Sequence, residues 1–330
     1  MRNFAYLRAE SESDAMQATA LHTGARFLAG GTTMLDLMKC GVEDPAALVD
    51  ITRLPNLDAI EAGPDQVRIG ALARMSDVAN HPTIERDFPA LSELLWRGAS
   101  EQLRNMATIG GNLLQRTRCN YFRDPSYSAC NKRNPGSGCA AMEGINRAHA
   151  VLGTSDHCIA TYPGDFAVAL VAFDAMVQIR GAQAHSIPAD DFFLLPEDRP
   201  HLEHPIAPGE LIVGIEIPVS AALRRSHYLK LRDRESYEFA VASAAVGIEL
   251  EADGRTMRDV RVALGGVATK PWRARQVEAA LNGRPLDEQV IRSASKLATD
   301  GALARGLNGF KIELAQRVVA RALLTVGGIK

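Results

Sequence analysis

The stretch Leu28-Ala29-Gly30-Gly31-Thr32-Thr33-Met34-Leu35 joins a strand-like segment to the start of a helix. Arg26–Ala29 predicts a short strand, Gly30–Thr33 predicts a turn, and Met34–Lys39 is apolar at helical spacing. Glycine lets the backbone approach a ligand closely, and free N–H groups at the start of a helix favour a phosphate. The phrase indicates a phosphate cradle, although a Gly-Gly pair alone is also typical of a plain turn.

A second phrase of the same kind is Ala107-Thr108-Ile109-Gly110-Gly111-Asn112-Leu113. Neither phrase matches the GxGxxG motif of a Rossmann fold or the GxxxxGK motif of a P-loop. Two such loops in one chain could hold the two ends of a dinucleotide. The pair therefore indicates a nucleotide-containing cofactor more strongly than either phrase does alone.

Four of the five cysteines follow the second phrase. They are Cys119, Cys130, Cys139 and Cys158, whereas Cys40 lies apart from them. The residues between them are rich in Gly, Pro, Asn, Arg and Lys, a composition typical of loops rather than of a core. Soft thiolates on a flexible loop suggest a metal site.

Three interpretations of these cysteines remain open from spacing alone. They could be ordinary thiols or two disulfides, or they could hold one zinc ion, although zinc sites favour Cys pairs two to four residues apart. They could also hold a [4Fe–4S] cluster, which a loop can surround without even spacing. In that case nearby basic side chains would offset the negative charge of the cluster; these are Arg118, Arg123, Lys132 and Arg133.

The pattern divides the chain into three regions, 1–51, 52–223 and 224–330. Beyond the first phrase, we expect strands at Ala47–Ile51, Gln66–Leu72, Met176–Arg180, Leu211–Ile217, Phe239–Leu250 and Arg258–Leu264, and helices at Ala90–Ala99, Asp165–Ala172, Trp272–Leu281, Asp287–Ala298 and Lys311–Leu324. Strands followed by helices predict an α+β unit at the C-terminal end.

Composition excludes several classes of protein. The chain has 330 residues, of which 46% are hydrophobic and 23% charged, as in an ordinary globular protein. A net charge of −2 argues against a general binder of nucleic acid or of membrane surfaces. We expect no membrane insertion, because no apolar run is long enough to cross a bilayer. The first residues also lack the apolar segment of a signal peptide.

The chain resembles the FAD-binding subunits of the xanthine oxidase family of molybdenum hydroxylases. The resemblance is carried by both glycine phrases, by Pro163-Gly164-Asp165, Lys230 and Arg234, and by Gly265-Gly266-Val267-Ala268 with Lys270-Pro271. It implies an α+β fold in which a two-lobed FAD-binding domain of the vanillyl-alcohol oxidase type precedes a C-terminal domain like that of the CO dehydrogenase flavoproteins. The lobes would be residues 1–51 and 52–223, and the C-terminal domain 224–330.

A narrower resemblance concerns residues 116–160. Gln115–Cys119, Cys130–Arg133 and Pro135–Ala141 resemble a subgroup with an extra [4Fe–4S] cluster, which includes periplasmic aldehyde oxidoreductases. It implies that Cys119, Cys130, Cys139 and Cys158 are the cluster ligands.

The family resemblance also implies which residues contact FAD. The pyrophosphate and ribityl groups would be held by Phe27, Leu28, Ala29, Gly30, Gly31, Thr32, Thr33, Met34 and Leu35, and the second loop would contribute Ala99, Thr108, Gly111, Asn112 and Gln115. Asp165 would bond the ribityl group or a flavin edge, Ile212 would pack on the isoalloxazine, and Lys230 would lie near its polar edge. Taken alone, Asp165 could cap the following helix and Lys230 could be a surface lysine.

The implied function is electron transfer. A large molybdopterin subunit would oxidise an aldehyde to a carboxylate, and a small subunit with two [2Fe–2S] clusters would pass the electrons through this chain's FAD to an external acceptor. Tyr237, three residues after Arg234, is a candidate shield of the flavin against NAD. The alternatives are a stand-alone flavin oxidase of the vanillyl-alcohol type and a zinc-organised scaffold. We expect a periplasmic complex, exported with a partner that carries the signal, or else a cytoplasmic one.

Overall fold

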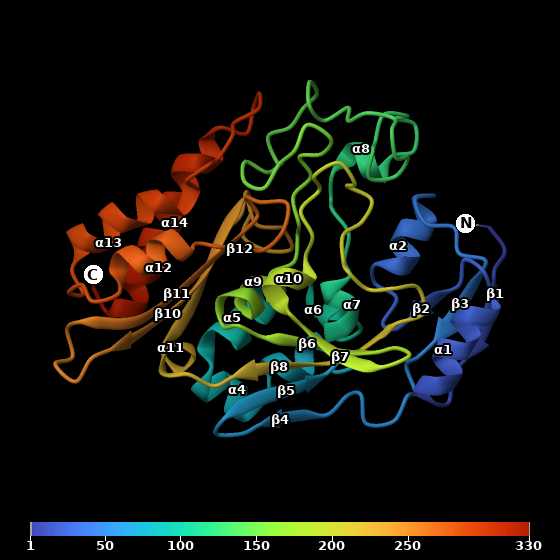
Figure 1. The fold of residues 1–330 in the computed structure, drawn as a ribbon, viewed down its shortest axis with the longest axis horizontal. Coiled ribbons are helices and arrows are strands. Elements are labelled where there is room, and N and C mark those ends of the chain that lie inside the picture. The colour runs from blue at the N-terminus through green and yellow to red at the C-terminus, as the bar shows by residue number, and fades with distance from the viewer. Residues whose placement is uncertain (1, 330) are drawn as a thin grey trace.

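The computed structural model describes residues 2–329 and contains three β-sheets, which Figure 1 shows with the helices that cover them. The strand orders are β1-β3-β2, β4-β5-β8-β6-β7 and β12-β11-β10-β9. The first sheet is parallel and the other two are antiparallel. This mixed arrangement confirms the expected α+β fold.

The N-terminal lobe is a small three-stranded α/β unit. Its elements are β1 (Ala5–Arg8), α1 (Glu12–Leu21), β2 (Arg26–Leu28), α2 (Met34–Lys39) and β3 (Ala47–Asp50). All four residues of β3 are buried because β3 pairs in parallel with both β1 and β2. The first glycine phrase joins β2 to α2, as the sequence predicts.

The middle part of the chain surrounds the five-stranded sheet. Its elements are β4 (Ile60–Ala62), β5 (Gln66–Gly70), α3 (Met75–Ala79), α4 (Pro82–Asp87), α5 (Pro89–Arg97), α6 (Glu101–Arg104), α7 (Ile109–Leu113), α8 (Asn120–Arg123), α9 (Phe166–Ala172), β6 (Met176–Arg180), β7 (Ala184–Pro188), α10 (Ala189–Phe192), β8 (Leu211–Pro218) and α11 (Ala221–Arg224). Every residue of α9 is buried, because this helix packs on α5 and α7 and also on β10 and β11 of the C-terminal sheet.

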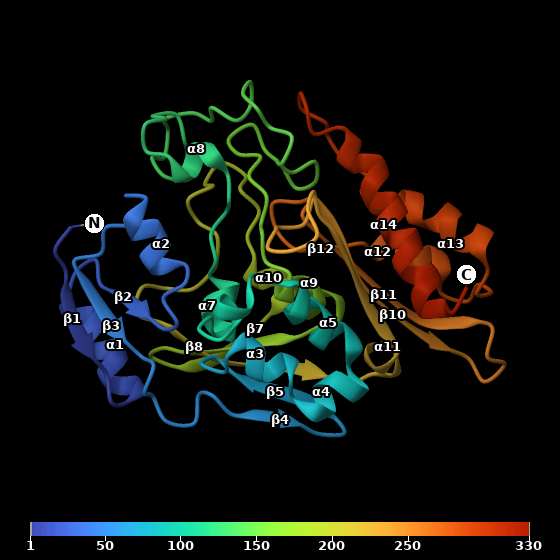
Figure 2. The ribbon, with the colours of Figure 1, turned by 180° about the vertical axis from the view of Figure 1, so that it is seen from behind.

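The C-terminal part is a four-stranded antiparallel sheet with helices on one face, as Figure 2 shows. Its elements are β9 (Ser226–Leu231), β10 (Ala242–Leu250), β11 (Met257–Gly265), β12 (Trp272–Arg273), α12 (Arg275–Leu281), α13 (Glu288–Ser295), the 3-10 helix η1 (Lys296–Thr299) and α14 (Phe310–Gly327). The long helix α14 packs across β9 and β10.

Two expected elements differ from the structure. Trp272 and Arg273, predicted at the start of a helix, form β12, because they pair with Leu264 and Ala263 of β11. The strand predicted from Phe239 begins only at Ala242, where the antiparallel pairing with β9 starts. The divisions at residues 51 and 223 remain predictions.

The cysteine-containing segment, 116–160, forms an irregular loop at the top of Figure 1, with α8 as its one helix. An isolated bridge pairs Cys130 with Cys139, and another pairs Leu152 with Ala268 of the C-terminal part. The loop is therefore tied both to itself and to the C-terminal sheet. No helix among residues 2–329 has the length and apolar character needed to span a membrane.

Candidate functional site

Two cavities meet at the two glycine phrases. The first cavity has a volume of about 390 Å³ and the second about 460 Å³. Thr32, Thr33 and Gly111 line both of them. The two cavities thus lie side by side, with the turn before α2 and the start of α7 between them, an arrangement suited to an elongated ligand.

The two phrases lie against each other because glycine removes a side chain at the contact. A Cβ added to Gly30 would lie 1.8 Å from the carbonyl oxygen of Met106, which no side chain tolerates. Gly31 has a φ of +73°, a left-handed conformation that favours glycine. The Gly110 N–H donates to the Ala71 carbonyl at 2.8 Å, which anchors α7 at the end of β5. Close packing of backbone therefore fixes the cradle.

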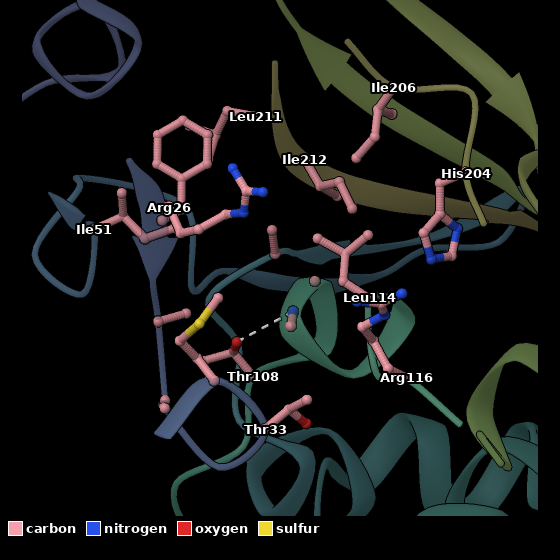
Figure 3. A pocket seen from close by; sticks show the side chains of 18 of the residues that line it. Arg26, Thr33, Ile51, Thr108, Leu114, Arg116, His204, Ile206, Leu211 and Ile212 are labelled. Carbon is pink, nitrogen blue, oxygen red and sulfur yellow. Dashed lines mark hydrogen bonds between the residues drawn. The ribbon is translucent and has the colours of Figure 1, made fainter. Parts of the chain in front are cut away.

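Gly111, in contrast, lines both cavities. Within residues 2–329 and apart from the backbone of its own helix, a Cβ added there would meet Thr108 Oγ1, at 3.0 Å. Thr108 caps α7, because its hydroxyl accepts a 3.4 Å hydrogen bond from the Gly111 N–H, shown as a dashed line in Figure 3. The start of α7 thereby lies between the two cavities, with Gly111 lining both of them.

The first cavity is largely apolar. Figure 3 shows Ile51, Leu114, Ile206, Leu211 and Ile212 around it. These side chains come from the end of β3, the end of α7, the loop before β8 and β8 itself. A flat, mostly apolar group is the ligand that such walls favour.

The sequence-predicted residues divide between the two cavities. The first is lined by Phe27, Ala29, Gly30, Gly31, Thr32, Thr33, Met34, Thr108, Gly111 and Ile212. The second is lined by Thr32, Thr33, Ala99, Gly111, Asn112, Gln115, Asp165, Lys230 and Tyr237. Leu28 and Leu35 line neither; their side chains lie on either side of Gly31 and pack the turn. Ile212 therefore faces a different cavity from Asp165 and Lys230.

A buried ion pair forms one wall of the second cavity. Lys230 Nζ lies 2.7 Å from Asp165 Oδ2 and also donates to the Arg97 carbonyl at 3.0 Å. The Tyr228 hydroxyl donates to Asp165 Oδ1 at 2.6 Å. Burial, reinforced by Asp165, raises the pKa of Tyr228 well above its usual value, so the phenol stays a neutral donor. Lys230 is only 1% exposed, which removes the alternative of a surface lysine.

The Asp165 side chain does not cap α9. It occupies the residue before α9, but its carboxylate makes no capping hydrogen bond. Both carboxylate oxygens are instead held by Tyr228 and Lys230. The carboxylate is therefore fixed at the cavity wall by β9, 63 and 65 residues away in the sequence.

Asn112 presents an acceptor that the protein does not use. Its Oδ1 is buried and has no hydrogen-bond partner within the described range 2–329, and Asn112 lines the second cavity. Buried polar atoms are nearly always paired, so an orphaned acceptor marks the position of a ligand donor. Gln115 supports this position, because its side-chain amide donates to the Asn112 carbonyl at 2.9 Å.

Tyr237 lies in the loop between β9 and β10, at the second cavity. It has a φ of +51° and is 55% exposed. The Arg234 guanidinium donates to its carbonyl, and the guanidinium carbon lies 5.6 Å from the ring centroid. Because the strand begins only at Ala242, Tyr237 is not packed at a strand start.

The four clustered cysteines line one small cavity in the loop 116–160, and Cys40 does not. All five thiols are free, so no disulfide is present. Burial raises the pKa of Cys119 to about 12 and of Cys158 to about 11. Such thiols ionise only when a strong positive charge, such as a bound metal, faces them.

The four thiols therefore share one cavity without any partner that the protein supplies to them as a set. Among residues 2–329, no three His, Cys, Asp or Glu side chains are placed where they could hold one ion.

The basic residues near the cysteines are mostly paired with carboxylates. Arg118 and Arg123 both bond Asp36, and Lys132 bonds Glu203 at 3.0 Å. Arg133 donates to backbone carbonyls. The expectation that these four cations simply offset the charge of a cluster is therefore too simple, and Lys132 alone among them lines the cysteine cavity.

Sequence reasoning missed several residues. Glu203 joins the first cavity to the cysteine loop, because it pairs with both Arg116 and Lys132. Burial acts to raise the pKa of Glu203, but Lys132 and Arg116 outweigh it and hold that pKa below its usual value. No pattern marks Glu203, which lies in an irregular loop. Tyr228 could have been found, because it lies two residues before Lys230 on the same strand face.

His149 is another residue that the sequence did not indicate. It is buried, and its Nε2 lies 3.1 Å from Cys119 Sγ. Burial, with a contribution from the Lys311 ammonium, lowers the pKa of His149 to about 4, so the ring is neutral. Its position between Cys139 and Cys158 was the only available signal.

Comparison with known proteins agrees with this geometry. The family described as the FAD binding domain in molybdopterin dehydrogenase matches residues 2–220, and the CO dehydrogenase flavoprotein C-terminal domain matches residues 227–328. The aldehyde oxidoreductase FAD-binding subunit PaoB of Escherichia coli K12 is 45% identical over 98% of each chain. The glyceraldehyde dehydrogenase medium chain of Sulfolobus acidocaldarius is 28% identical over 90% of this chain and 87% of its own length.

Solved structures share the fold over nearly the whole chain. Quinoline 2-oxidoreductase from Pseudomonas putida 86 has a TM-score of 0.76 at 24% identity, covering 99% of this chain and 98% of that one. Carbon monoxide dehydrogenase from Hydrogenophaga pseudoflava, in a form that lacks the Mo-pyranopterin moiety, also has a TM-score of 0.76, at 26% identity and the same coverage. These likenesses confirm the expected FAD-binding domain followed by a C-terminal α+β domain.

Proposed function

The chain belongs to the family of FAD-binding subunits of molybdopterin dehydrogenases, and we propose that it carries both FAD and a [4Fe–4S] cluster in a molybdenum-dependent aldehyde oxidoreductase. It is an oxidoreductase subunit that acts with partner subunits. The observation that carries the proposal is the pair of adjoining cavities joined at Thr32, Thr33 and Gly111.

The residues present fit FAD. The apolar first cavity, with Phe27 and Ile212, suits the adenine, and the backbone N–H and hydroxyl groups of Thr32 and Thr33, at the turn before α2, suit the pyrophosphate. This assignment moves Ile212 from the isoalloxazine to the adenine end. The second cavity then takes the isoalloxazine.

In the second cavity, the chain's own residues orient the ring. Lys230 supplies a fixed positive charge for the polar edge, and its pairing with Asp165 keeps that charge in place. The orphaned Asn112 Oδ1 accepts from a ligand N–H or O–H. Tyr237 covers the outer side and restricts access to the ring. Bound FAD supplies the exchange between one-electron iron–sulfur donors and a one- or two-electron acceptor.

The four cysteines line one cavity, and their spacing in the sequence lacks the close Cys pairs that zinc sites favour, so we infer an iron–sulfur cluster rather than a zinc ion. We assign Cys119, Cys130, Cys139 and Cys158 as ligands and exclude Cys40. The cluster would tie a loop of more than 40 residues that otherwise has little regular structure.

The relatives support the rest of the proposal. We assign aldehydes as the substrate class, with a large molybdopterin subunit and a small subunit holding two [2Fe–2S] clusters as partners, because PaoB is named as an aldehyde oxidoreductase subunit and the Sulfolobus relative as a glyceraldehyde dehydrogenase chain. Electrons leave through this chain to an external acceptor. We place the complex in the periplasm, exported folded with the partner that carries the signal; the cytoplasm is the alternative.

A mixing experiment tests the proposal. The FAD-loaded chain alone should not be bleached by an aldehyde, whereas the complete complex should be bleached within seconds. Bleaching of the isolated chain would identify a stand-alone flavin oxidase.

Cell fractionation tests the proposed location. It should place this chain in the periplasm only when the partner with its signal is present.

A further inference from the structure

His149 lies directly against one of the four clustered cysteines. Its ring is 5% exposed, and its Nε2 is 3.1 Å from Cys119 Sγ. We propose that the His149 Nε2–H donates a hydrogen bond to the Cys119 sulfur and thereby raises the reduction potential of the cluster held there. This inference rests on the proposed cluster, and it assigns His149 as a positioning and tuning residue.

The environment of the ring selects the tautomer. Nδ1 is buried and has no hydrogen-bond partner among residues 2–329. Nδ1 is therefore unpaired in either tautomer, and the choice is made at Nε2, which faces the Cys119 sulfur at 3.1 Å. A ligated thiolate sulfur has no proton to donate and can only accept. The ring therefore carries a proton on Nε2.

The chain holds His149 rigidly in this position. The His149 N–H donates to the Asn146 carbonyl at 2.9 Å, and the buried Asn146 side chain bonds the Ala141 carbonyl and the Leu307 N–H. Lys311 of α14 donates to the Ala148 carbonyl at 2.9 Å. Contacts from both the cysteine loop and the C-terminal part therefore fix the backbone at His149, and burial of the residue restricts the imidazole.

The expected effect follows from electrostatics. A reduced cluster is more negative than an oxidised one, so a donor aimed at a ligand sulfur stabilises the reduced form more. Hydrogen bonds to metal ligands tune metal sites in this way.

The test is a redox titration of the purified holo-chain, followed by electron paramagnetic resonance, in wild type and in His149→Phe. We expect the ratio of reduced to oxidised cluster at a fixed potential to fall about tenfold, equivalent to about 59 mV for one electron. His149→Gln, which keeps a donor, should recover part of the shift. His22→Phe is the control, because His22 is exposed at the end of α1 and lines neither the cysteine cavity nor the two cavities at the glycine phrases; the potential should not change.

If His149→Phe loses its cluster, a second measurement on the wild type still tests the proposed hydrogen bond. Pulsed spectroscopy of wild type with ¹⁵N-labelled histidine should show a weak nitrogen coupling, transmitted through sulfur. A strong coupling of the kind that direct ligation gives would overturn the inference, and so would equal potentials in wild type and His149→Phe. Absence of any cluster in the wild type would instead contradict the proposed function.

Discussion

The Lys230 ammonium on β9 lies 2.7 Å from the Asp165 carboxylate at the start of α9, and both residues line the second cavity. One side chain comes from a strand of the C-terminal sheet and the other from the residue before a helix, and they are 1% and 10% exposed. Removing one partner from such a pair leaves an uncompensated buried charge, which costs about 3–5 kcal/mol. The pair therefore serves both the stability of the domain junction and the ligand cavity.

Lys230→Met should lower the free energy of unfolding by about 3 kcal/mol, because Asp165 would stay buried without its cation. Urea unfolding measures this change, and FAD content measured after gel filtration should fall as well. The double variant Asp165→Asn, Lys230→Met should regain most of the stability but not the FAD. Equal stability of wild type and the single variant would show that the pair is unimportant.

Gly30→Ala should separate the two glycine loops, because the new Cβ would lie 1.8 Å from the Met106 carbonyl oxygen. We expect Gly30→Ala to lower the free energy of unfolding by more than about 2 kcal/mol and to abolish FAD retention.

Gly111→Val should abolish FAD retention with the chain still folded, since Gly111 faces the cavities. Gly63→Ala, where the nearest atom is 3.4 Å away, is the control. Full flavin content in Gly111→Val would refute the placement of the cofactor.

Tyr237→Ala should change the rates with which the complete complex reduces dyes and quinones, because the exposed ring lies at the rim of the second cavity. The wild type should not reduce NAD, since hydride transfer needs the nicotinamide within roughly 3–3.5 Å of the flavin. Leu303→Ala, an exposed residue outside the cavities, is the control. Rapid NAD reduction by the wild type, or a Tyr237→Ala variant with unaltered rates for every acceptor, would remove this role.

Lys311 makes the stability of the C-terminal part depend on pH. Its Nζ is buried and donates to the Ala148 and Gly266 carbonyls, and burial, with the nearby Arg147, lowers the pKa of Lys311 to about 7. Between pH 7 and about 10 the unfolded chain binds one more proton than the folded chain, so stability rises with pH by about 1.4 kcal/mol per unit.

Replacing Lys311 by Met removes this contribution. The variant should be more stable relative to the wild type at pH 6.5 than at pH 9, as measured by urea midpoints. Lys39→Met, on the exposed surface of α2, should leave the pH dependence unaltered. Parallel pH profiles for wild type and Lys311→Met would contradict the assignment.

The elements that could be predicted from the sequence are those that local patterns of apolar and turn-forming residues determine. The glycine phrase between β2 and α2, the apolar helix α9 and the long helix α14 follow from periodicity and turn chemistry. Periodicity could not place Trp272, because its strand exists only through pairing with β11. Local preference is overridden where tertiary pairing is strong.

The site was less predictable from the sequence, because the residues that contact each other there lie far apart in the chain. The family resemblance indicated Asp165 and Lys230, but nothing local indicates that they meet. The need for glycine at position 30 arises from the Met106 carbonyl, a tertiary contact. Glu203 and His149 lie in irregular loops, where no periodicity marks the side chains that point inward.

The central claim is that one chain holds both a flavin and a four-iron cluster, and chemical analysis tests it most directly. Iron, acid-labile sulfide, zinc and FAD are measured in the purified chain, in Cys40→Ser and in the Ser variants of Cys119, Cys130, Cys139 and Cys158. We expect about four irons, four sulfides and one FAD per chain in the wild type and Cys40→Ser, and loss of iron and sulfide in each of the other four. One zinc without iron or flavin, or cluster loss in Cys40→Ser with retention in one of the four, would contradict the account.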